Sequence, residues 1–237
     1  MKFGSLFSGI GGLDLGLERA GMECRWQVEI DPYCTKVLTK HWPAVPKFGD
    51  IRELTGAEIE PVDLICGGFP CQPVSKAGSR RGIADDRWLW PDFARLVRIL
   101  RPELVLVENV SGLASLGMGI VLGDLSALGY DAEWTSVPAA AFGAHHIRDQ
   151  IYILAYPNCN GGKATQGLLA RPRAFYQPLL LDQAKVSGAF WQSHQHPVCG
   201  VFDGPAGGLD RLRGLGNAVV PQVAEWIGRR ILAGEGY

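Results

Sequence analysis

Short apolar runs alternate with amphipathic stretches through the first half of the chain, and this alternation constrains the fold more than any other feature. The apolar runs have the length of buried strands, and the stretches between them carry apolar residues at helical spacing. We predict strands at residues 2–7, 24–30, 62–66, 104–108 and 151–155, and helices near residues 13–20, 32–41, 93–100, 113–128 and 219–231. Strand and helix in alternation favour an α/β fold, with a parallel sheet covered by helices on both faces.

The alternation stops after residue 155. Residues 156–208 are rich in Pro, Gly, Gln and His and show no clear period, and regular structure resumes only toward the final helix. We therefore divide the chain into a core of residues 1–155 plus 209–237 and a small, irregular subdomain of residues 156–208. The final helix is expected to return beside the first glycine-rich loop and to complete a binding pocket there.

Composition excludes several classes of protein. The 237 residues carry a formal net charge of −1, so the overall charge does not indicate binding to nucleic acid. Any surface that binds nucleic acid must therefore be a local basic patch. The six cysteines show no framework spacing and no signal peptide is visible, which indicates free thiols in a reducing cytosol. No apolar run approaches the roughly 20 residues of a membrane span.

Three features at strand ends point to a nucleoside. A glycine-rich turn, Phe-Ser-Gly-Ile-Gly-Gly at residues 7–12, follows the first strand and opens a helix. Glu29 ends the second strand, where a carboxylate can accept hydrogen bonds from ribose hydroxyls. Asp50 follows a short strand and can accept from an adenine amino group. Each is also typical of an ordinary turn or strand end, but together they favour a cofactor that contains adenosine.

The sharpest feature is the segment Cys-Gly-Gly-Phe-Pro-Cys-Gln-Pro at residues 66–73. It follows the third strand, and open parallel sheets bind ligands at the carboxyl ends of their strands. Cys71 lies between two prolines beyond the strand, where a thiolate can act as a nucleophile. Cys66, at the end of the strand, is expected to be buried and inert.

Glu108 and Asn109 end the next strand. In a closed site, desolvation favours the neutral form of a carboxyl group. Glu108 can then donate a proton to a ring nitrogen. The alternative is that this pair caps a helix or forms a salt bridge.

Together these segments resemble the DNA cytosine-5 methyltransferases. The resemblance rests on residues 7–12, Glu29, residues 49–51, Pro70-Cys71-Gln72, Glu108-Asn109-Val110 and Gly216-Asn217-Ala218-Val219, in the family's order and spacing. It covers about residues 1–155 and 209–237, and the compact arrangement is similar to phage and prophage members. It implies a Rossmann-like core that binds S-adenosylmethionine, with residues 156–208 as the target-recognition subdomain.

The resemblance also implies the roles of individual residues. Cys71 attacks carbon 6 of a cytosine flipped out of duplex DNA, Glu108 supports protonation of ring nitrogen 3, and Arg148 belongs to the cytosine pocket. The implied cofactor-binding residues are Phe7, Ile10, Gly12, Leu13, Glu29, Ile30, Asp50, Ile51, Leu89, Asn217 and Val219. The implied substrate-binding residues are Pro70, Gln72, Ser75, Arg87, Asn109, Gln150, Arg171 and Arg173.

Two stretches depart from the family pattern. The family has Gln-x-Arg-x-Arg where this chain has His-Ile-Arg-Asp-Gln at residues 146–150, so Gln150 replaces an arginine and offers an amide without charge. The recognition subdomain is short, and an ordinary loop position is an equal alternative for Arg171 and Arg173. Cys159, His194, His196 and Cys199 are zinc-ligand types, but their irregular spacing leads us to expect no metal.

Three functions remain open from the sequence. The leading one is methylation of cytosine in double-stranded DNA at one short sequence, as in restriction-modification, by a monomer in the cytoplasm beside the nucleoid. The second keeps the chemistry but acts on RNA, as in tRNA methyltransferases that resemble this family. The third is a DNA-binding homologue impaired by the change at Gln150.

Overall fold

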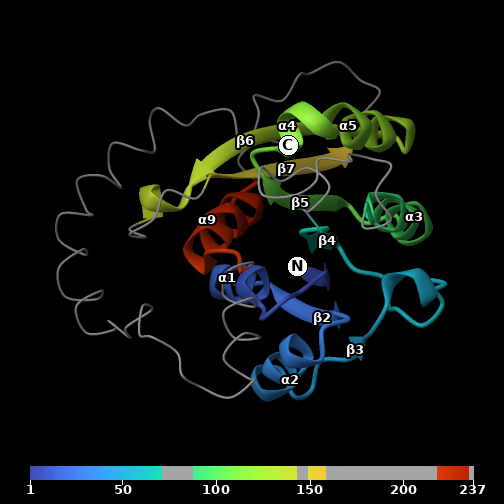
Figure 1. The fold of residues 1–237 in the computed structure, drawn as a ribbon, viewed down its shortest axis with the longest axis vertical. Helices are drawn as coiled ribbons and strands as arrows, with labels where there is room; N and C mark the ends of the chain where they lie inside the picture. The colour runs from blue at the N-terminus through green and yellow to red at the C-terminus, as the bar shows by residue number, and fades with distance from the viewer. Residues whose placement is uncertain (71–87, 143–148, 159–217, 235–237) are drawn as a thin grey trace, which may run out of the picture.

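The computed structural model describes residues 1–70, 88–142, 149–158 and 218–234. A seven-stranded sheet in the order β3-β2-β1-β4-β5-β7-β6 forms the centre of this part of the chain (Figure 1). The strands are β1 (Lys2–Leu6), β2 (Glu23–Val28), β3 (Lys47–Phe48), β4 (Leu64–Gly67), β5 (Leu104–Val110), β6 (Tyr130–Pro138) and β7 (Asp149–Pro157).

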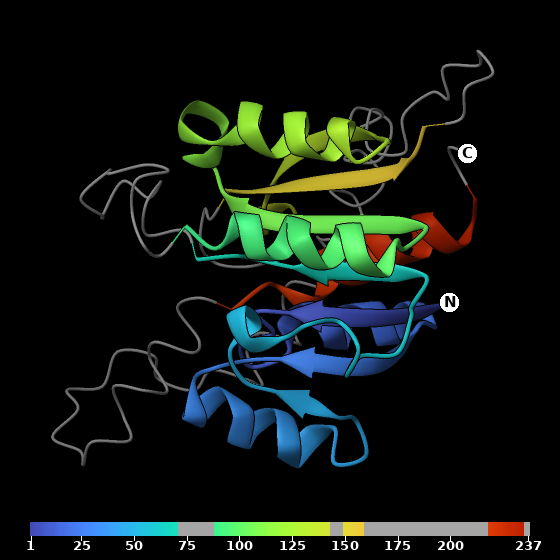
Figure 2. The same ribbon diagram turned by 90° about the vertical axis from the view of Figure 1, so that its right-hand side faces the viewer.

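Helices cover both faces of the sheet, as predicted. Figures 1 and 2 show α1 and α9 side by side on one face and α3 on the other. The helices are α1 (Gly12–Ala20), α2 (Pro32–His41), η1 (Ile51–Glu53), α3 (Trp90–Leu100), α4 (Leu113–Leu116), α5 (Met118–Ala127), η3 (Ala139–Phe142) and α9 (Pro221–Leu232). The α/β class and the Rossmann-like arrangement are therefore confirmed.

The prediction of a wholly parallel sheet was wrong at one edge. Strands β3, β2, β1, β4 and β5 pair in parallel, but β7 pairs antiparallel with both β5 and β6. The sequence prediction also missed β6, because this edge strand is only partly buried and shows no apolar run. Only residues 139–148 separate β6 from β7, and strands joined by a short connection commonly pair antiparallel. The sheet order places β7 between β5 and β6.

The predicted helix at residues 113–128 is two helices. It breaks at Gly117, where the backbone leaves helical geometry (φ −156, ψ −10) and the ring of Trp88 packs against the glycine. The other predicted boundaries agree with the structure to within a few residues, although β7 runs on to Pro157, two residues past the predicted end of the core segment.

The C-terminal segment packs against the start of α1. An added Cβ at Gly12 would lie 2.3 Å from the carbonyl oxygen of Val219, and one at Gly16 would lie 2.3 Å from that of Pro221. Only glycine permits so close an approach of two backbones. The predicted return of the final helix to the glycine-rich loop is therefore confirmed, with the helix beginning at Pro221.

A buried polar cluster joins α1 to the first two strands. The Asp14 carboxyl group is fully buried and accepts hydrogen bonds from Ser5 Oγ (3.0 Å) and Gln27 Nε2 (2.8 Å). Burial raises the pKa of Asp14 to about 6, although these hydrogen bonds oppose the rise. Nearby Cys66 is also fully buried, and burial raises the pKa of its thiol well above the ordinary value. The prediction that Cys66 is buried is confirmed, and a raised thiol pKa agrees with an unreactive thiol.

None of the helices in the described ranges combines the length and apolar character needed to cross a membrane.

Candidate active site

A cavity of about 390 Å³ lies at the carboxyl ends of the parallel strands. Five successive strand ends contribute to its wall, together with the start of α3 and of β7. The lining residues are Phe7, Gly9, Val28, Glu29, Ile30, Asp31, Cys34, Gly49, Asp50, Ile51, Arg52, Gly68, Phe69, Pro70, Leu89, Glu108, Asn109, Val110 and Gln150. This is the place where open parallel sheets bind their ligands, and the volume is in the range of small-molecule sites.

One side of the cavity is built around Glu29. Its two carboxylate oxygens accept hydrogen bonds from the backbone N–H groups of Gly9 (2.7 Å) and Asp31 (2.8 Å). Burial raises the pKa of Glu29 above its ordinary value, and these backbone hydrogen bonds oppose the rise. Each oxygen retains a lone pair, so the carboxylate can still accept from a ligand hydroxyl.

The backbone of the first turn is shaped to serve this carboxylate. Phe7 has φ 54 and Gly9 has φ 56, both in the left-handed region. A non-glycine residue such as Phe7 pays a steric cost there, and such residues cluster at binding sites. The turn directs the N–H group of Gly9 toward Glu29 and brings the side chain of Phe7 to the cavity wall.

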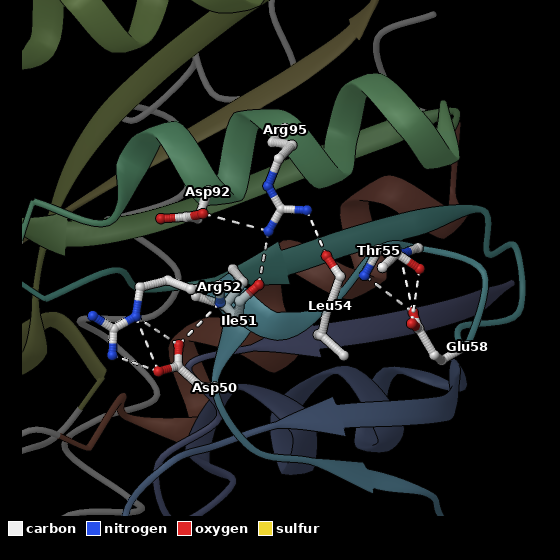
Figure 3. A network of polar contacts seen from close by, with 9 residues as sticks. Asp50, Ile51, Arg52, Leu54, Thr55, Glu58, Asp92 and Arg95 are labelled. Carbon is white, nitrogen blue, oxygen red and sulfur yellow. Dashed lines mark hydrogen bonds and ion pairs between the residues drawn. The ribbon is translucent and has the colours of Figure 1, made fainter.

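The Asp50 carboxylate lies on the same side and already has a partner. It caps η1 by accepting from the backbone N–H of Arg52 (2.9 Å), and it forms an ion pair with the Arg52 guanidinium (Figure 3). The hydrogen bonds from Arg52 lower the pKa of Asp50. A ligand amino group that binds Asp50 must therefore share this carboxylate with Arg52.

Arg95 ties α3 to the turn that carries Asp50. In Figure 3 its guanidinium reaches from α3 to the carbonyl oxygens of Leu54 (2.5 Å) and Ile51 (2.8 Å). Its weaker interaction with Asp92 (3.4 Å) holds the side chain along the helix. Because Ile51 lines the cavity, Arg95 sets the position of this wall relative to α3.

Apolar side chains complete the first side of the cavity. Ile30 is 63% exposed, which is unusual for an isoleucine, whereas Ile51 is buried. Phe7 and Leu89 are partly buried and pack on the core. A flat apolar ring fits between such walls, while the carboxylates bind the polar edge of the same ligand.

The opposite side is formed by the ends of β4 and β5. The Asn109 side chain donates from Nδ2 to the carbonyl oxygen of Phe69 (3.1 Å), while its Oδ1 accepts from the N–H of Val110 (2.9 Å). Asn109 therefore caps no helix. It fixes the backbone one residue before Pro70, at the entrance to the segment that contains Cys71.

Glu108 is buried in this second side, where a glycine and a glutamine surround its carboxyl group. An added Cβ at Gly68 would lie 2.3 Å from Glu108 Oε2, so a side chain at this position would displace the carboxyl group from where it lies. Gln150 donates from Nε2 to Glu108 Oε1. Sequence reasoning placed Gln150 against the cytosine but missed this hydrogen bond. It also missed Gly68, although the pair of glycines after the strand was a visible signal.

The structure brings together ten of the residues predicted from the sequence. Six cofactor candidates and four candidates for catalysis or substrate binding line the one cavity: Phe7, Glu29, Ile30, Asp50, Ile51, Leu89, Pro70, Glu108, Asn109 and Gln150. Four other cofactor candidates do not line it among the described residues: Ile10, Gly12, Leu13 and Val219. Of these, Leu13 belongs to the core and Gly12 is packed against Val219.

The remaining candidates lie outside the described residues. They are Cys71, Gln72, Ser75, Arg87, Arg148, Arg171, Arg173 and Asn217, together with the weak zinc candidates Cys159, His194, His196 and Cys199. Within the described ranges, no cluster of metal-ligating side chains occurs.

The fold and the cavity define a Rossmann-like methyltransferase core. The family model for C-5 cytosine-specific DNA methylase matches residues 1–174. The chain therefore belongs to the C-5 cytosine-specific DNA methylase family.

Relatives with assigned activities are type II methyltransferases. The chain is 29% identical over 207 residues to M.DsaV of Dactylococcopsis salina, covering 83% of this chain and 59% of that protein. It is 34% identical over 163 residues to M.HhaI of Haemophilus parahaemolyticus, covering 67% of this chain and 50% of the relative. The chain thus spans only about half the length of the curated relatives it matches.

Solved structures agree with the fold. A protein assigned as a DNA modification methyltransferase, encoded within a prophage of E. coli, superimposes with a TM-score of 0.56 at 32% identity, covering 66% of this chain and 47% of that one. The Dnmt2 methyltransferase of S. pombe superimposes with a TM-score of 0.57 at 23% identity, covering 69% and 53%, and supports the fold alone.

Proposed function

We propose that this chain transfers a methyl group to carbon 5 of a cytosine flipped out of duplex DNA, at one short sequence, through a covalent bond to Cys71. The observation that carries the proposal is the shared cavity. Pro70, adjacent to Cys71, lies on the same wall as Glu108, and the facing wall carries Glu29 and Asp50. A base and an adenosine cofactor would thus meet in one enclosure.

The residues present fit S-adenosylmethionine. Glu29 has free lone pairs for ribose hydroxyls, and Phe7, Ile30 and Ile51 offer apolar surface for the adenine ring. Asp50 can accept from the adenine amino group if Arg52 shares the carboxylate. When bound, this cofactor supplies a methyl group on a positively charged sulfur.

Two side chains of this chain carry the bond changes on the base. The Cys71 thiolate adds to carbon 6, while Glu108 gives a proton to ring nitrogen 3. This makes carbon 5 nucleophilic, which it is not in the aromatic ring, and splits one difficult step into easier ones. Methyl transfer to carbon 5 leaves S-adenosylhomocysteine as the other product. A water molecule that enters the cavity then accepts the proton of carbon 5, the bond between carbon 6 and sulfur breaks to release the Cys71 thiolate, and nitrogen 3 returns its proton to Glu108. The target carbon is hidden in stacked DNA, so the base must leave the helix.

The first experiment is cytosine-conversion sequencing of unmethylated DNA after incubation with the full chain and S-adenosylmethionine. Cytosines protected within one short motif, and unprotected with Cys71→Ala, are the expected result. The thiol contributes about a 10⁴-fold or greater share of the rate, as nucleophiles of covalent enzymes do, so the variant should give no protection.

Other outcomes would sink the proposal in distinct ways. Methylation of tRNA in the same assay, with unprotected DNA, would indicate an RNA enzyme. DNA binding with intact cofactor affinity but without methylation would indicate an impaired homologue. As part of the proposal we expect a monomer that works on DNA in the cytoplasm, and light scattering of the chain with and without duplex DNA tests the oligomeric state.

A further inference from the structure

Glu108 and Gln150 form a buried pair in the wall of the cavity, and the proposed reaction gives no role to Gln150. Both residues are only 6% exposed, and both line the cavity. Gln150 stands where the resemblance drawn from the sequence leads us to expect an arginine.

The pairing of β5 with β7 places the two side chains on one face of the sheet. In this antiparallel pair Gln150 is opposite Val110, and Glu108 is opposite Tyr152. Glu108 and Gln150 are therefore diagonal neighbours, a separation that long side chains can span. The Gln150 amide donates from Nε2 to Glu108 Oε1, and Gly68 leaves the space that Oε2 occupies.

A glutamine with a merely structural role would be satisfied on both sides of its amide. Among the described residues, however, Gln150 Oε1 is buried and has no hydrogen-bond partner. A buried acceptor without a hydrogen-bond partner is unfavourable. A residue such as methionine would fill the same space and would bury no unpaired acceptor. The one hydrogen bond that this amide makes within the described residues is with the carboxyl group that faces the cavity.

We infer that Gln150 is a positioning residue whose amide orients the Glu108 carboxyl group toward ring nitrogen 3 of the base. The inference rests on the proposed function. A neutral amide is sufficient because the task is to fix the rotation of the carboxyl group, and a single well-aligned N–H donor does this.

The test compares two trapped substrates on the same preparation of the full chain. Duplexes carry 5-fluorocytosine or 5-fluoro-2-pyrimidinone at the target position found by conversion sequencing. Fluorine at carbon 5 is not released as a proton is, so the covalent adduct with Cys71 persists and can be counted. The pyrimidinone ring lacks the amino group and is more electrophilic at carbon 6, so its addition depends less on acid assistance.

With Gln150→Met, which has a similar volume and no donor, adduct formation on 5-fluorocytosine should fall at least about 10-fold, whereas on the pyrimidinone it should fall less than about 3-fold. Gln150→Arg should restore much of the cytosine rate, because it returns a donor. In a Glu108→Gln background, Gln150→Met should have no further effect, because coupled residues are not additive. The ratio of the adduct-formation rates on the two duplexes does not depend on what fraction of a variant is folded.

Equal losses on both substrates would overturn the inference, as would a further loss in the Glu108→Gln background. Failure of Gln150→Arg to raise the cytosine-to-pyrimidinone ratio above that of Gln150→Met would also count against it. If the unaltered chain forms no adduct on either duplex, the proposed function itself fails and the inference with it.

Discussion

The two sides of the cavity are held in different ways. On the side that we propose to bind the cofactor, here the cofactor side, the Glu29 carboxylate is fixed by backbone N–H groups of Gly9 and Asp31, within its own loop and the neighbouring one. On the side that we propose to bind the base, here the base side, the Glu108 carboxyl group accepts from the Gln150 side chain, 42 residues away, and occupies the space left by the absence of a side chain at Gly68.

This difference predicts which substitutions should disturb each side of the cavity. Backbone donors are supplied by the course of the chain, so most substitutions nearby leave the hydrogen bonds to Glu29 intact. The surroundings of Glu108 depend on the identity of two side-chain positions on other strands. Single substitutions should therefore damage the base side selectively, while the cofactor side responds mainly to changes in the elements that support its turns.

Among the substitutions that test this comparison, Gly68→Ala should have the largest effect. Its added methyl group would lie 2.3 Å from Glu108 Oε2 and must displace the carboxyl group. The rate of methyl transfer should fall about 10²- to 10³-fold, because a shift of about 1 Å in a reacting group has that consequence. Single-turnover methylation measures the rate, and calorimetric titration with S-adenosylmethionine should show little change in cofactor affinity.

The matched control is Gly123→Ala on α5, where an added Cβ meets no atom within 4 Å. A similar loss of rate in both variants, or a loss of cofactor affinity as large as the loss of rate, would erase the proposed distinction between the two sides.

The second effect concerns stability, and it comes from the carboxyl group beneath the cofactor side. Asp14 bonds to Ser5 of β1 and Gln27 of β2, the strands whose ends carry Phe7 and Glu29. Its folded-state pKa of about 6 exceeds the ordinary 3.8, so the folded state binds the proton more tightly. The stabilisation is fully present below about pH 4 and is lost as the pH rises through about 6.

The measurement is urea unfolding of the unaltered chain and of Asp14→Asn between pH 4 and pH 7. The free energy of unfolding of the unaltered chain should fall relative to that of the variant by roughly 3 kcal/mol, since one pKa unit corresponds to about 1.4 kcal/mol. Asp131→Asn, at an exposed position of β6, is the control. A difference between the unaltered chain and Asp14→Asn that stays constant with pH would show that burial does not shift this group.

The smallest effect is expected from Arg95→Met. The substitution keeps the packing of the stem on α3 but removes the hydrogen bonds to the carbonyl oxygens of Ile51 and Leu54. The dissociation constant for S-adenosylmethionine should rise about 5- to 10-fold, which corresponds to roughly 1 kcal/mol for hydrogen bonds at a partly exposed position. The rate at saturating cofactor should change little.

Arg98→Met is the control, because this arginine on the same helix is exposed. A fall in the rate at saturating cofactor, without a change in cofactor affinity, would contradict this prediction. It would indicate that Arg95 supports the base side and not the cofactor side.

Much of the fold and of the cofactor side could be predicted from the sequence because their signals are local. The apolar runs that became β1, β2, β4 and β5 are short and bounded by turns. Polar residues mark the carboxyl ends of three strands: Glu29 after β2, Asp50 after β3 and Glu108 in β5. The carboxyl ends of parallel strands lie at the same edge of a sheet. Glu29, Asp50 and Glu108 therefore line one cavity. The edge strand β6 escaped prediction because its partly exposed residues show no apolar run.

The sequence by itself determined the family, the positions of the polar strand ends and the order of the core elements apart from β6 and the break between α4 and α5. The tertiary structure alone decided that β7 is antiparallel, and with it that Gln150 reaches Glu108. It also decided that Gly12 serves the packing of Val219 and that Gly68 makes room for Glu108. Local patterns are encoded by neighbouring residues, whereas register and close approach depend on which distant segments lie side by side, and no short stretch of sequence contains that information.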